Sequence, residues 1–258
     1  MAVCASTTQD EGRARELASD LQLALCATAT RAHDCSEYAA LLVVDADTLN
    51  LQQTGRGAPG PVVVAFGSAA MRHRRRGGHN ELLGKAIGLA KKPALRVLDA
   101  TAGLGRDSFV LADLGASVSL CERNPIIANM LASGLTAAAA SDDPWLRQVV
   151  QRMTLYSDDA RTLADAELHE VDVIYLDPMF PERDKSAKVK KAMALFHALL
   201  GPGDDADELL LWSLRRDVAR VVVKRPPRAA HLAGQKPSHS IAGKAVRYDV
   251  HVLRSLGQ

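Results

Sequence analysis

The chain is poor in aromatic residues, in cysteine and in net charge, and each shortage excludes a class of protein. Aromatic side chains make up 4% of the 258 residues, whereas hydrophobic residues make up 47%. The core is therefore expected to consist of Leu, Val, Ala and Ile, as in a parallel sheet covered by helices. The net charge of +2 excludes a uniformly basic nucleic-acid coat protein.

Signatures of metal-binding, membrane and secreted proteins are also missing. The four cysteines form no C-x-x-C pair and no two histidines have metal-ligand spacing, so we expect free thiols and no metal. No run of about 18 apolar residues occurs, so we expect no membrane span. The N-terminus lacks a basic start followed by an apolar stretch, so we predict a cytoplasmic protein.

Hydrophobic patterning divides the chain into two parts. Residues 1–70 hold a helical stretch at Gly12–Leu25 and a loop rich in glycine and proline at Thr54–Pro61. Short apolar runs in this part predict strands at Ala2–Ser6, Leu41–Val44 and Val62–Phe66. The mixture predicts a small N-terminal α+β lobe, followed by a main domain at residues 71–258.

Strands and helices alternate in the second part, which predicts an α/β fold. Expected strands are Arg96–Thr101, Ser117–Glu122, Met153–Tyr156, Val171–Leu176, Ala219–Lys224 and Tyr248–Leu253. Expected helices are His79–Ala90, Arg106–Leu114, Pro125–Ala138, Ala187–Leu200 and Leu209–Val218. This order builds a doubly wound, mostly parallel sheet, which binds ligands at the carboxyl ends of its strands.

The most informative motif is Asp177-Pro178-Met179-Phe180, which follows the buried apolar run Val171–Leu176. The Asp177 carboxylate and the Pro178 carbonyl suit the N–H groups of a flat amine, and the Phe180 ring suits the face of a base. The motif therefore predicts catalysis of methyl transfer to the exocyclic nitrogen of a nucleobase. A simple turn at the end of the strand is the alternative.

Asp177 is expected to align the amine and not to act as a strong base. The lone pair of such an amine is delocalised into the ring, and accepting its N–H bonds localises that pair. Orientation of the two reacting groups alone can contribute about 7–11 kcal/mol. The amine becomes acidic as it is methylated, so proton loss can follow the transfer.

A glycine-containing turn follows the first regular strand, in the segment from Asp99 to Asp107. Gly103 allows the backbone to turn sharply and to approach a ligand closely. Ser108 stands where a dinucleotide-binding fingerprint has its third glycine, which disfavours a nicotinamide-dependent oxidoreductase. Asp99 before the turn suits a cationic ligand, and S-adenosylmethionine carries both a sulfonium and an ammonium.

Acidic residues also end the next two strands. Glu122 lies where an acid commonly accepts hydrogen bonds from ribose hydroxyls, and Arg123 beside it suits the border of an adenine. Asp158 and Asp159 follow the third strand and suit the adenine amino group. Acids after three successive strands, together with the glycine turn, predict S-adenosylmethionine as the cofactor.

Basic residues gather in three clusters near these loops. The clusters are Arg72, Arg74, Arg75 and Arg76; Lys185, Lys188, Lys190 and Lys191; and Lys224, Arg225 and Arg228. We predict RNA-phosphate contacts at Arg74, Arg75, Arg76, Lys185, Lys188, Lys224 and Arg225. A solvated surface is the alternative for each cluster.

The combined motifs resemble a known family. They are Asp99–Asp107, Glu122–Pro125, Tyr175–Pro181, Lys190-Lys191, Val221–Pro226 and Arg247–Asp249. Together they resemble the RsmJ family of bacterial small-subunit ribosomal RNA methyltransferases, over about residues 71–250. The N-terminal lobe matches the family weakly.

The resemblance implies a class I methyltransferase fold with a mostly parallel, Rossmann-like, seven-stranded sheet. It implies S-adenosylmethionine as cofactor, and the N2 of a guanosine near the 3′ end of 16S rRNA as methyl acceptor. The partner is then 16S rRNA or the small ribosomal subunit. Cofactor contacts carry over to Arg106, Asp107, Glu122, Arg123, Asp158, Asp159 and Asp177. The pair Asp158-Asp159 departs from small hydroxyl residues in the family.

Two other classes of function stay open at this point. A DNA or RNA adenine-N6 methyltransferase uses a similar motif of acid, proline and aromatic, although little chain remains for a domain that reads DNA sequence. A non-catalytic RNA-binding factor in ribosome assembly would keep the fold without the reaction. Cofactor binding and the identity of the methylated nucleic acid would separate the three.

Overall fold

The computed structural model describes residues 1–76, 81–178 and 205–257, which form two β-sheets and their covering helices. The larger sheet has seven strands in the order β11-β12-β10-β9-β6-β7-β8. Their bounds are β6 (Arg96–Asp99), β7 (Ser117–Cys121), β8 (Met153–Tyr156), β9 (Val173–Leu176), β10 (Arg220–Arg225), β11 (His239–Ala242) and β12 (Arg247–Val252). This arrangement confirms the predicted α/β class and strand number.

The larger sheet is doubly wound. Strands β8, β7, β6, β9 and β10 pair in parallel, whereas β12 runs antiparallel to both of its neighbours. The chain runs from β6 outward to β7 and β8, and then returns to β9 on the other side of β6. The strand order therefore reverses between β6 and β9, which is where such sheets bind ligands.

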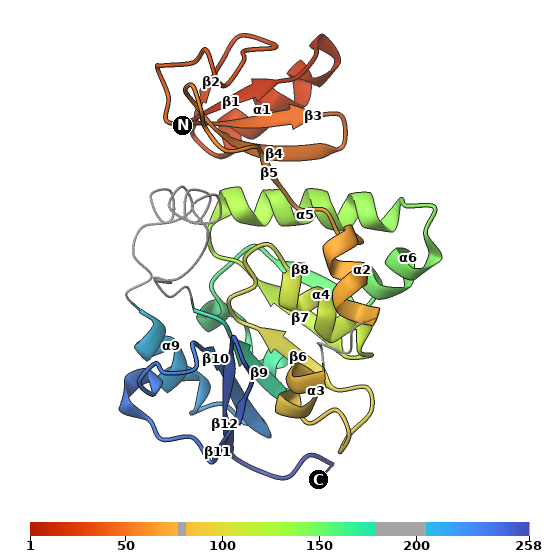
Figure 1. Ribbon diagram of the computed structural model, residues 1–258, viewed down its shortest axis with the longest axis vertical. Helices are drawn as coiled ribbons and strands as arrows, with labels where there is room; N and C mark the ends of the chain where they lie inside the picture. The colour runs from red at the N-terminus through yellow and green to blue at the C-terminus, as the bar shows by residue number, and fades with distance from the viewer. Residues whose placement is uncertain (77–80, 179–204, 258) are drawn as a thin grey trace.

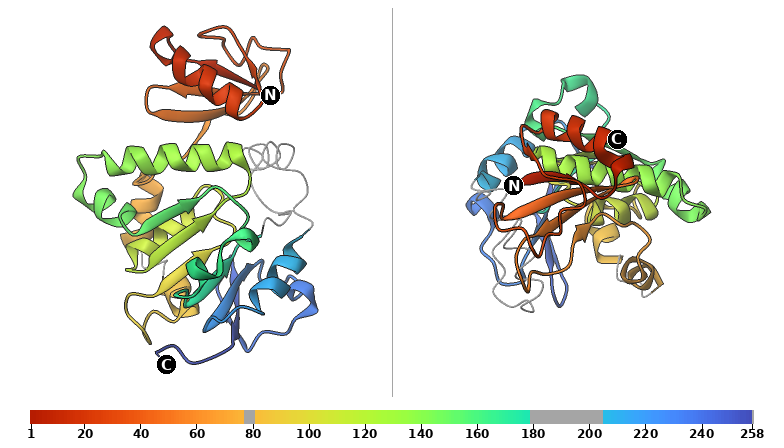
Figure 2. Two further views of the ribbon diagram at one scale, coloured as in Figure 1. Left: turned by 180° about the vertical axis from the view of Figure 1, so that it is seen from behind. Right: turned by 90° about the horizontal axis from the view of Figure 1, so that it is seen from above.

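Helices cover both faces of this sheet, so its central strands β6, β9 and β10 are buried on both sides (Figures 1 and 2). The helices are α2 (Ala69–Arg76), α3 (Glu81–Ile87), α4 (Arg106–Asp113), α5 (Pro125–Ala139), α6 (Pro144–Val150), α7 (Asp165–Leu168) and α9 (Ala206–Ser213), with short 3-10 turns η2 (Ala160–Thr162) and η3 (Leu232–Gly234). Successive side chains of β6 and β9 pack into two different hydrophobic clusters. Val97 and Tyr175 belong to one cluster, and Leu98 and Ile174 belong to the other. This two-sided burial explains the continuous apolar run before Asp177.

The smaller sheet belongs to the N-terminal part of the chain. Its order is β2-β1-β3-β4-β5, with β1 parallel to β2 and β3 and with antiparallel pairs elsewhere. The elements are β1 (Ala2–Ala5), η1 (Thr8–Asp10), α1 (Glu11–Asp20), β2 (Ala24–Leu25), β3 (Ala40–Asp45), β4 (Thr48–Gln53) and β5 (Val62–Val63). The predicted α+β character of this part is confirmed.

Helix α5 lies between the two sheets, with the N-terminal sheet stacked on it (Figure 1). Ser133 Oγ of α5 donates to the Asp47 carbonyl over 2.7 Å, and Gly134 contacts Val64. One hydrophobic cluster contains Val3 and Leu42 of the smaller sheet as well as Val97 of the larger one. Because this core runs through both parts, the boundary at residue 70 stays a prediction.

Several predicted elements differ from the observed ones. The predicted helix Gly12–Leu25 ends at Asp20, and the chain then forms the short strand β2. The predicted helix Leu209–Val218 is shifted toward the N-terminus, as α9. Strands β4 and β11 and helices α2 and α6 were not predicted. The predicted helix Ala187–Leu200 lies outside the described residues.

The contact between Gly134 and Val64 tests the packing of α5 against the N-terminal part. A Cβ at Gly134 would lie 2.3 Å from Cγ1 and 2.8 Å from the carbonyl oxygen of Val64. Gly134→Ala is therefore expected to lower the melting temperature, because a clash costing about 1–3 kcal/mol exceeds a helix-propensity gain of about 1 kcal/mol. Gly12→Ala in α1 meets no atom within 4 Å and should not destabilise. A Gly134→Ala protein at least as stable as wild type would contradict this packing.

Candidate functional site

Acidic residues meet at the carboxyl ends of β6, β7 and β9. Asp99 is the last residue of β6, Glu122 follows β7, and Asp177 follows β9. The backbone N–H of Asp177 donates to Thr101 Oγ1 over 2.7 Å, which ties the loop after β9 to the loop after β6. The structure thus brings the predicted cofactor and substrate motifs together at the point where strand order reverses.

Glu122 organises the glycine turn. Its Oε2 accepts the Gly103 N–H over 2.9 Å, and its Oε1 accepts the Asn124 N–H over 2.8 Å. Gly103 and Gly105 have φ values of 54° and 70°, which a side chain would disfavour. Burial raises the pKa of Glu122 above its usual range, although the two N–H groups oppose this shift. The acid predicted to bind a ribose therefore also fixes the turn.

Asp99 is buried, with 1% of its surface exposed. Its Oδ1 accepts the Thr101 N–H over 3.1 Å, and its Oδ2 accepts a short hydrogen bond from the Ser108 hydroxyl. Burial raises the pKa of Asp99 to about 7, and the neighbouring carboxylates of Asp107 and Asp177 add to the shift. Ser108, which marked only a missing glycine in the sequence, is the side chain that holds this acid.

Lys224 joins two of the site carboxylates. Its Nζ donates to Oδ2 of Asp107 and to Oδ2 of Asp177, each over 2.7 Å. The Tyr175 hydroxyl donates to the same Asp107 oxygen over 2.7 Å. Burial alone would lower the pKa of Lys224, but the two carboxylates outweigh burial and raise it. Lys224 was predicted to contact RNA, and the structure places it inside the acid cluster instead.

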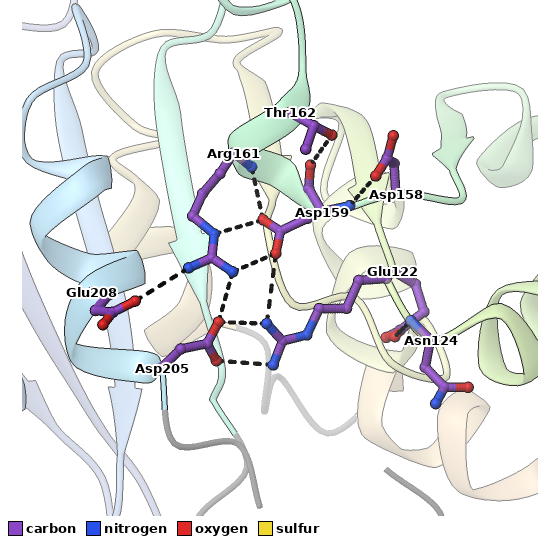
Figure 3. Close-up of polar contacts among 9 residues, drawn as sticks. Glu122, Asn124, Asp158, Asp159, Arg161, Thr162, Asp205 and Glu208 are labelled. Carbon is purple, nitrogen blue, oxygen red and sulfur yellow. Dashed lines mark hydrogen bonds and ion pairs between the residues drawn. The ribbon is translucent and has the colours of Figure 1, made fainter. Parts of the chain in front are cut away.

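An ion-pair network surrounds the loops that follow β7 and β8 (Figure 3). Arg161 binds Asp159 through Nε and Nη2 over 2.9 and 2.6 Å, and its Nη2 also reaches Asp205 over 2.7 Å. Arg123 pairs with Asp205 through both terminal nitrogens and lies 3.6 Å from Asp159. Hydrogen bonds from the arginines lower the pKa of Asp159 and of Asp205. No sequence motif marks Arg161 or Asp205 as part of this network.

The other predicted cofactor residues lie at the rim of the same site. Arg106 begins α4 and is exposed, whereas Asp107 behind it is buried. Asp158 is exposed and accepts the Asp159 N–H over 2.8 Å. Pro178 is buried beside Asp177, and Met179 and Phe180 lie outside the described residues. The described part of the site therefore contains all predicted cofactor residues but only part of the predicted base clamp.

Two predicted RNA contacts are engaged within the protein. Arg75 Nε lies 3.1 Å from Asp113 Oδ2, and its guanidinium sits over the Trp145 ring. Arg225 is buried and donates to the Ala230 carbonyl over 2.6 Å. Arg225 is therefore not an open surface cation, whereas the Arg75 side chain is 53% exposed beside its partners. The side chains of Arg74 and Arg76, and all of Lys185 and Lys188, lie outside the described part.

Among the residues that the structure describes, no group of three or more His, Cys, Asp or Glu side chains is arranged to hold a metal ion. No described helix has the length and apolar character needed to cross a bilayer.

Comparisons with known proteins identify the family. A family model described as "Putative SAM-dependent methyltransferase" matches residues 25–253. The ribosomal RNA small subunit methyltransferase J of Marinobacter nauticus is 46% identical over 260 residues, covering 99% of this chain and 92% of that protein. The protein of the same name in Cellvibrio japonicus is 48% identical over 223 residues, covering 84% of each. This chain belongs to the ribosomal RNA small subunit methyltransferase J family.

A solved structure with a similar fold supports the same assignment. The crystal structure of a SAM-dependent methyltransferase from Neisseria gonorrhoeae is 33% identical, with a TM-score of 0.72 over 98% of this chain and 96% of that one. The family and the sheet order together establish a class I, S-adenosylmethionine-dependent methyltransferase. The acids at the strand ends are therefore residues of a methyltransferase fold at its ligand-binding edge.

Asp205 allows a test of the ion-pair network. Asp205→Asn is expected to lower the free energy of unfolding by about 1 kcal/mol at neutral pH, since the pairs are partly exposed. The pKa of Asp205 is lowered in the folded state, so its contribution is present above the unfolded value of about 3.9 and is lost as pH falls through the folded value. Denaturant unfolding measured from neutral pH down to about pH 3 checks this.

Asp217→Asn is the matched control, because the Asp217 side chain is 97% exposed in its pair with Arg254. This control is expected to leave stability unchanged. An Asp205→Asn protein as stable as wild type at neutral pH, or a stability difference that does not shrink as pH falls below about 3.9, would contradict the network.

Proposed function

We propose that the protein transfers a methyl group from S-adenosylmethionine to the exocyclic N2 of a guanosine near the 3′ end of 16S rRNA. The observation that carries the proposal is the position of Asp177, which follows β9, lies near the buried Asp99 and is held by Thr101 and Lys224. The names of the relatives support small-subunit ribosomal RNA as the substrate. We place the reaction in the cytoplasm, with rRNA or the small subunit as partner.

The donor set at the strand ends fits the cofactor. S-adenosylmethionine, when bound, supplies a methyl group on a sulfonium. Asp99 offers a buried carboxylate for positive charge, and Glu122 offers acceptors beside the glycine turn. A Cβ at Gly103 would meet nothing closer than 4.0 Å, so the turn leaves open space. Arg106, Asp107, Arg123, Asp158 and Asp159 complete the proposed cofactor set.

Asp177 and Pro178 would hold the amine. The carboxylate of Asp177 and the carbonyl of Pro178 accept its two N–H bonds, which localises the lone pair on nitrogen and aims it at the methyl carbon. With the cofactor bound, the C–N bond would form as the C–S bond broke, and the electron pair of the C–S bond would stay on sulfur. The nitrogen then loses a proton to the Asp177 carboxylate or to water. Stacking by Phe180 remains a prediction from the sequence.

Charge distribution supports RNA contact through the methyltransferase part of the chain. The first 66 residues contain eight acidic and only four basic side chains, although the whole chain carries +2. An acidic N-terminal part repels phosphates, so RNA is expected to approach the edge of the larger sheet.

Transfer of label from tritiated S-adenosylmethionine tests the proposal directly. The purified protein is offered naked 16S rRNA, small ribosomal subunits and duplex DNA in parallel. We expect label in rRNA, free or assembled, recovered as N2-methylguanosine after digestion. Label in DNA alone, or in adenine, would refute the proposal in favour of an adenine-N6 methyltransferase.

Asp177→Ala tests the substrate half of the site. Loss of an acceptor that acts on the reacting amine is expected to lower kcat by about 10²–10³-fold. Binding of S-adenosylmethionine, measured by calorimetry, should weaken without being lost. Asp142→Ala removes an exposed carboxylate from the loop before α6 and is expected to retain activity. Full activity of Asp177→Ala would contradict the role of Asp177 in aligning the amine.

The raised pKa of Asp99 predicts a pH dependence of cofactor binding. Burial raises the pKa of Asp99 to about 7, so the carboxyl loses its charge as pH falls through that value. Affinity for the cationic cofactor should therefore decline by up to about tenfold from about pH 8 to about pH 6. Asp99→Asn should bind more weakly and show a flat profile over that range. Equal wild-type affinity at both pH values would show that Asp99 does not bind the cofactor.

A further inference from the structure

Lys224 has the sequence context of an RNA-binding residue, but its observed partners are carboxylates. Its ammonium lies 2.7 Å from Asp107 Oδ2 and 2.7 Å from Asp177 Oδ2, and its side chain is 23% exposed. Hydrogen bonds between charged groups at this distance are about twice as strong as neutral ones. The two carboxylates take two of the three N–H donors of this ammonium and offset its charge, which weakens its attraction for a phosphate.

We propose that Lys224 is a positioning residue for methyl transfer, whose ammonium fixes the orientation of the Asp177 carboxylate, and that it is not a phosphate ligand. This inference rests on the proposed function, because it assigns Lys224 a part in the same reaction. Lys224 acts through Asp177 and is not itself in contact with the reacting atoms.

Strand register places the two residues side by side. Val223 of β10 pairs with Leu176 of β9 in parallel, so Lys224 and Asp177 are the next residues along neighbouring strands. The backbone of Asp177 is held independently, because its N–H donates to Thr101 Oγ1 over 2.7 Å. The carboxylate therefore has one anchor through the backbone and a second through Lys224. These two contacts restrict the orientation of the Asp177 carboxylate. A fixed orientation is needed if the carboxylate is to align the substrate amine.

Lys224 is itself held in place by Asp107. Asp107 lies in the first turn of α4. Its Oδ2 accepts hydrogen bonds from both the Lys224 ammonium and the Tyr175 hydroxyl. Tyr175 is fully buried in the sheet. The contacts form a continuous chain from Tyr175 through Asp107 and Lys224 to Asp177. Such a chain leaves the ammonium little freedom to swing out toward an RNA backbone.

The ammonium also balances charge within the site. Asp99, Asp107 and Asp177 lie close enough that the last two raise the pKa of the first. A cation between Asp107 and Asp177 offsets their mutual repulsion and favours the ionised form of Asp177. An ionised carboxylate has about four lone-pair sites, so a bond from Lys224 is compatible with accepting an N–H of the substrate.

Lys224→Met separates positioning from phosphate binding. Loss of a charge-assisted bond worth about 1.5–3 kcal/mol should lower kcat at saturating RNA by about 10–100-fold. The loss should fall on kcat and not on the KM for rRNA, because Lys224 acts on the alignment of the amine and not on RNA binding. The Kd for rRNA and its dependence on salt should stay as in wild type. Lys91→Met, in the exposed turn between α3 and β6, is the matched control and should behave as wild type.

The opposite pattern would overturn the inference. A phosphate ligand would instead give weaker RNA binding, a salt slope reduced by about 1, and wild-type kcat at saturating RNA. Melting and cofactor calorimetry verify that Lys224→Met is folded. Lys224→Arg decides the question if Lys224→Met does not fold, since a guanidinium binds phosphate well but does not fit a site shaped for an ammonium. If Lys224 positions Asp177, Lys224→Arg should have a lowered kcat. If Lys224 binds phosphate, Lys224→Arg should keep full activity.

The same assays distinguish this inference from the proposed function. A wild-type protein that methylates no guanosine in rRNA would defeat the proposed function. If the wild type is active and Lys224→Met has the same kcat as wild type, only the role assigned to Lys224 would be contradicted.

Discussion

Parallel pairing between β6 and β9 is the constraint on which the site depends. These strands are adjacent in the sheet but far apart in the sequence, and the chain reverses its winding direction between them. Their carboxyl ends therefore place Asp99 and Asp177 together, and the bond from the Asp177 N–H to Thr101 Oγ1 locks the two loops in register. The cofactor half and the substrate half become one site because of this pairing.

Concentrating acids at one edge of a sheet has an electrostatic cost that the structure offsets locally. Glu122 uses its two oxygens on backbone N–H groups, and Asp99 is held by Ser108 and Thr101. Lys224 supplies the positive charge between two further carboxylates. Such pairing keeps the acids ordered and available to a cationic ligand, which is the chemistry that a methyltransferase of this family requires.

The sequence allowed prediction of the features that depend on local pattern. Apolar runs followed by acids located Asp99, Glu122 and Asp177, because strand ends in an alternating α/β chain fall at one edge. The partner of Asp177 could not be predicted, since Lys224 reaches it through a tertiary contact, and Arg161 reaches Asp205 in the same way. Strand β4 has an alternating signal in only two apolar residues, Leu49 and Leu51, which does not suffice to predict a strand. Strand β11 is short and largely exposed, so its pattern carried little signal.

Mass mapping of 16S rRNA tests the central claim most directly. Ribosomal RNA from cells lacking this protein is compared with RNA from the same cells complemented with the wild-type chain or with Asp177→Ala. The account predicts that one N2-methylguanosine near the 3′ end disappears on deletion, returns with the wild type and stays absent with Asp177→Ala. An unchanged methylation pattern in the deleted cells, or full restoration by Asp177→Ala, would contradict it.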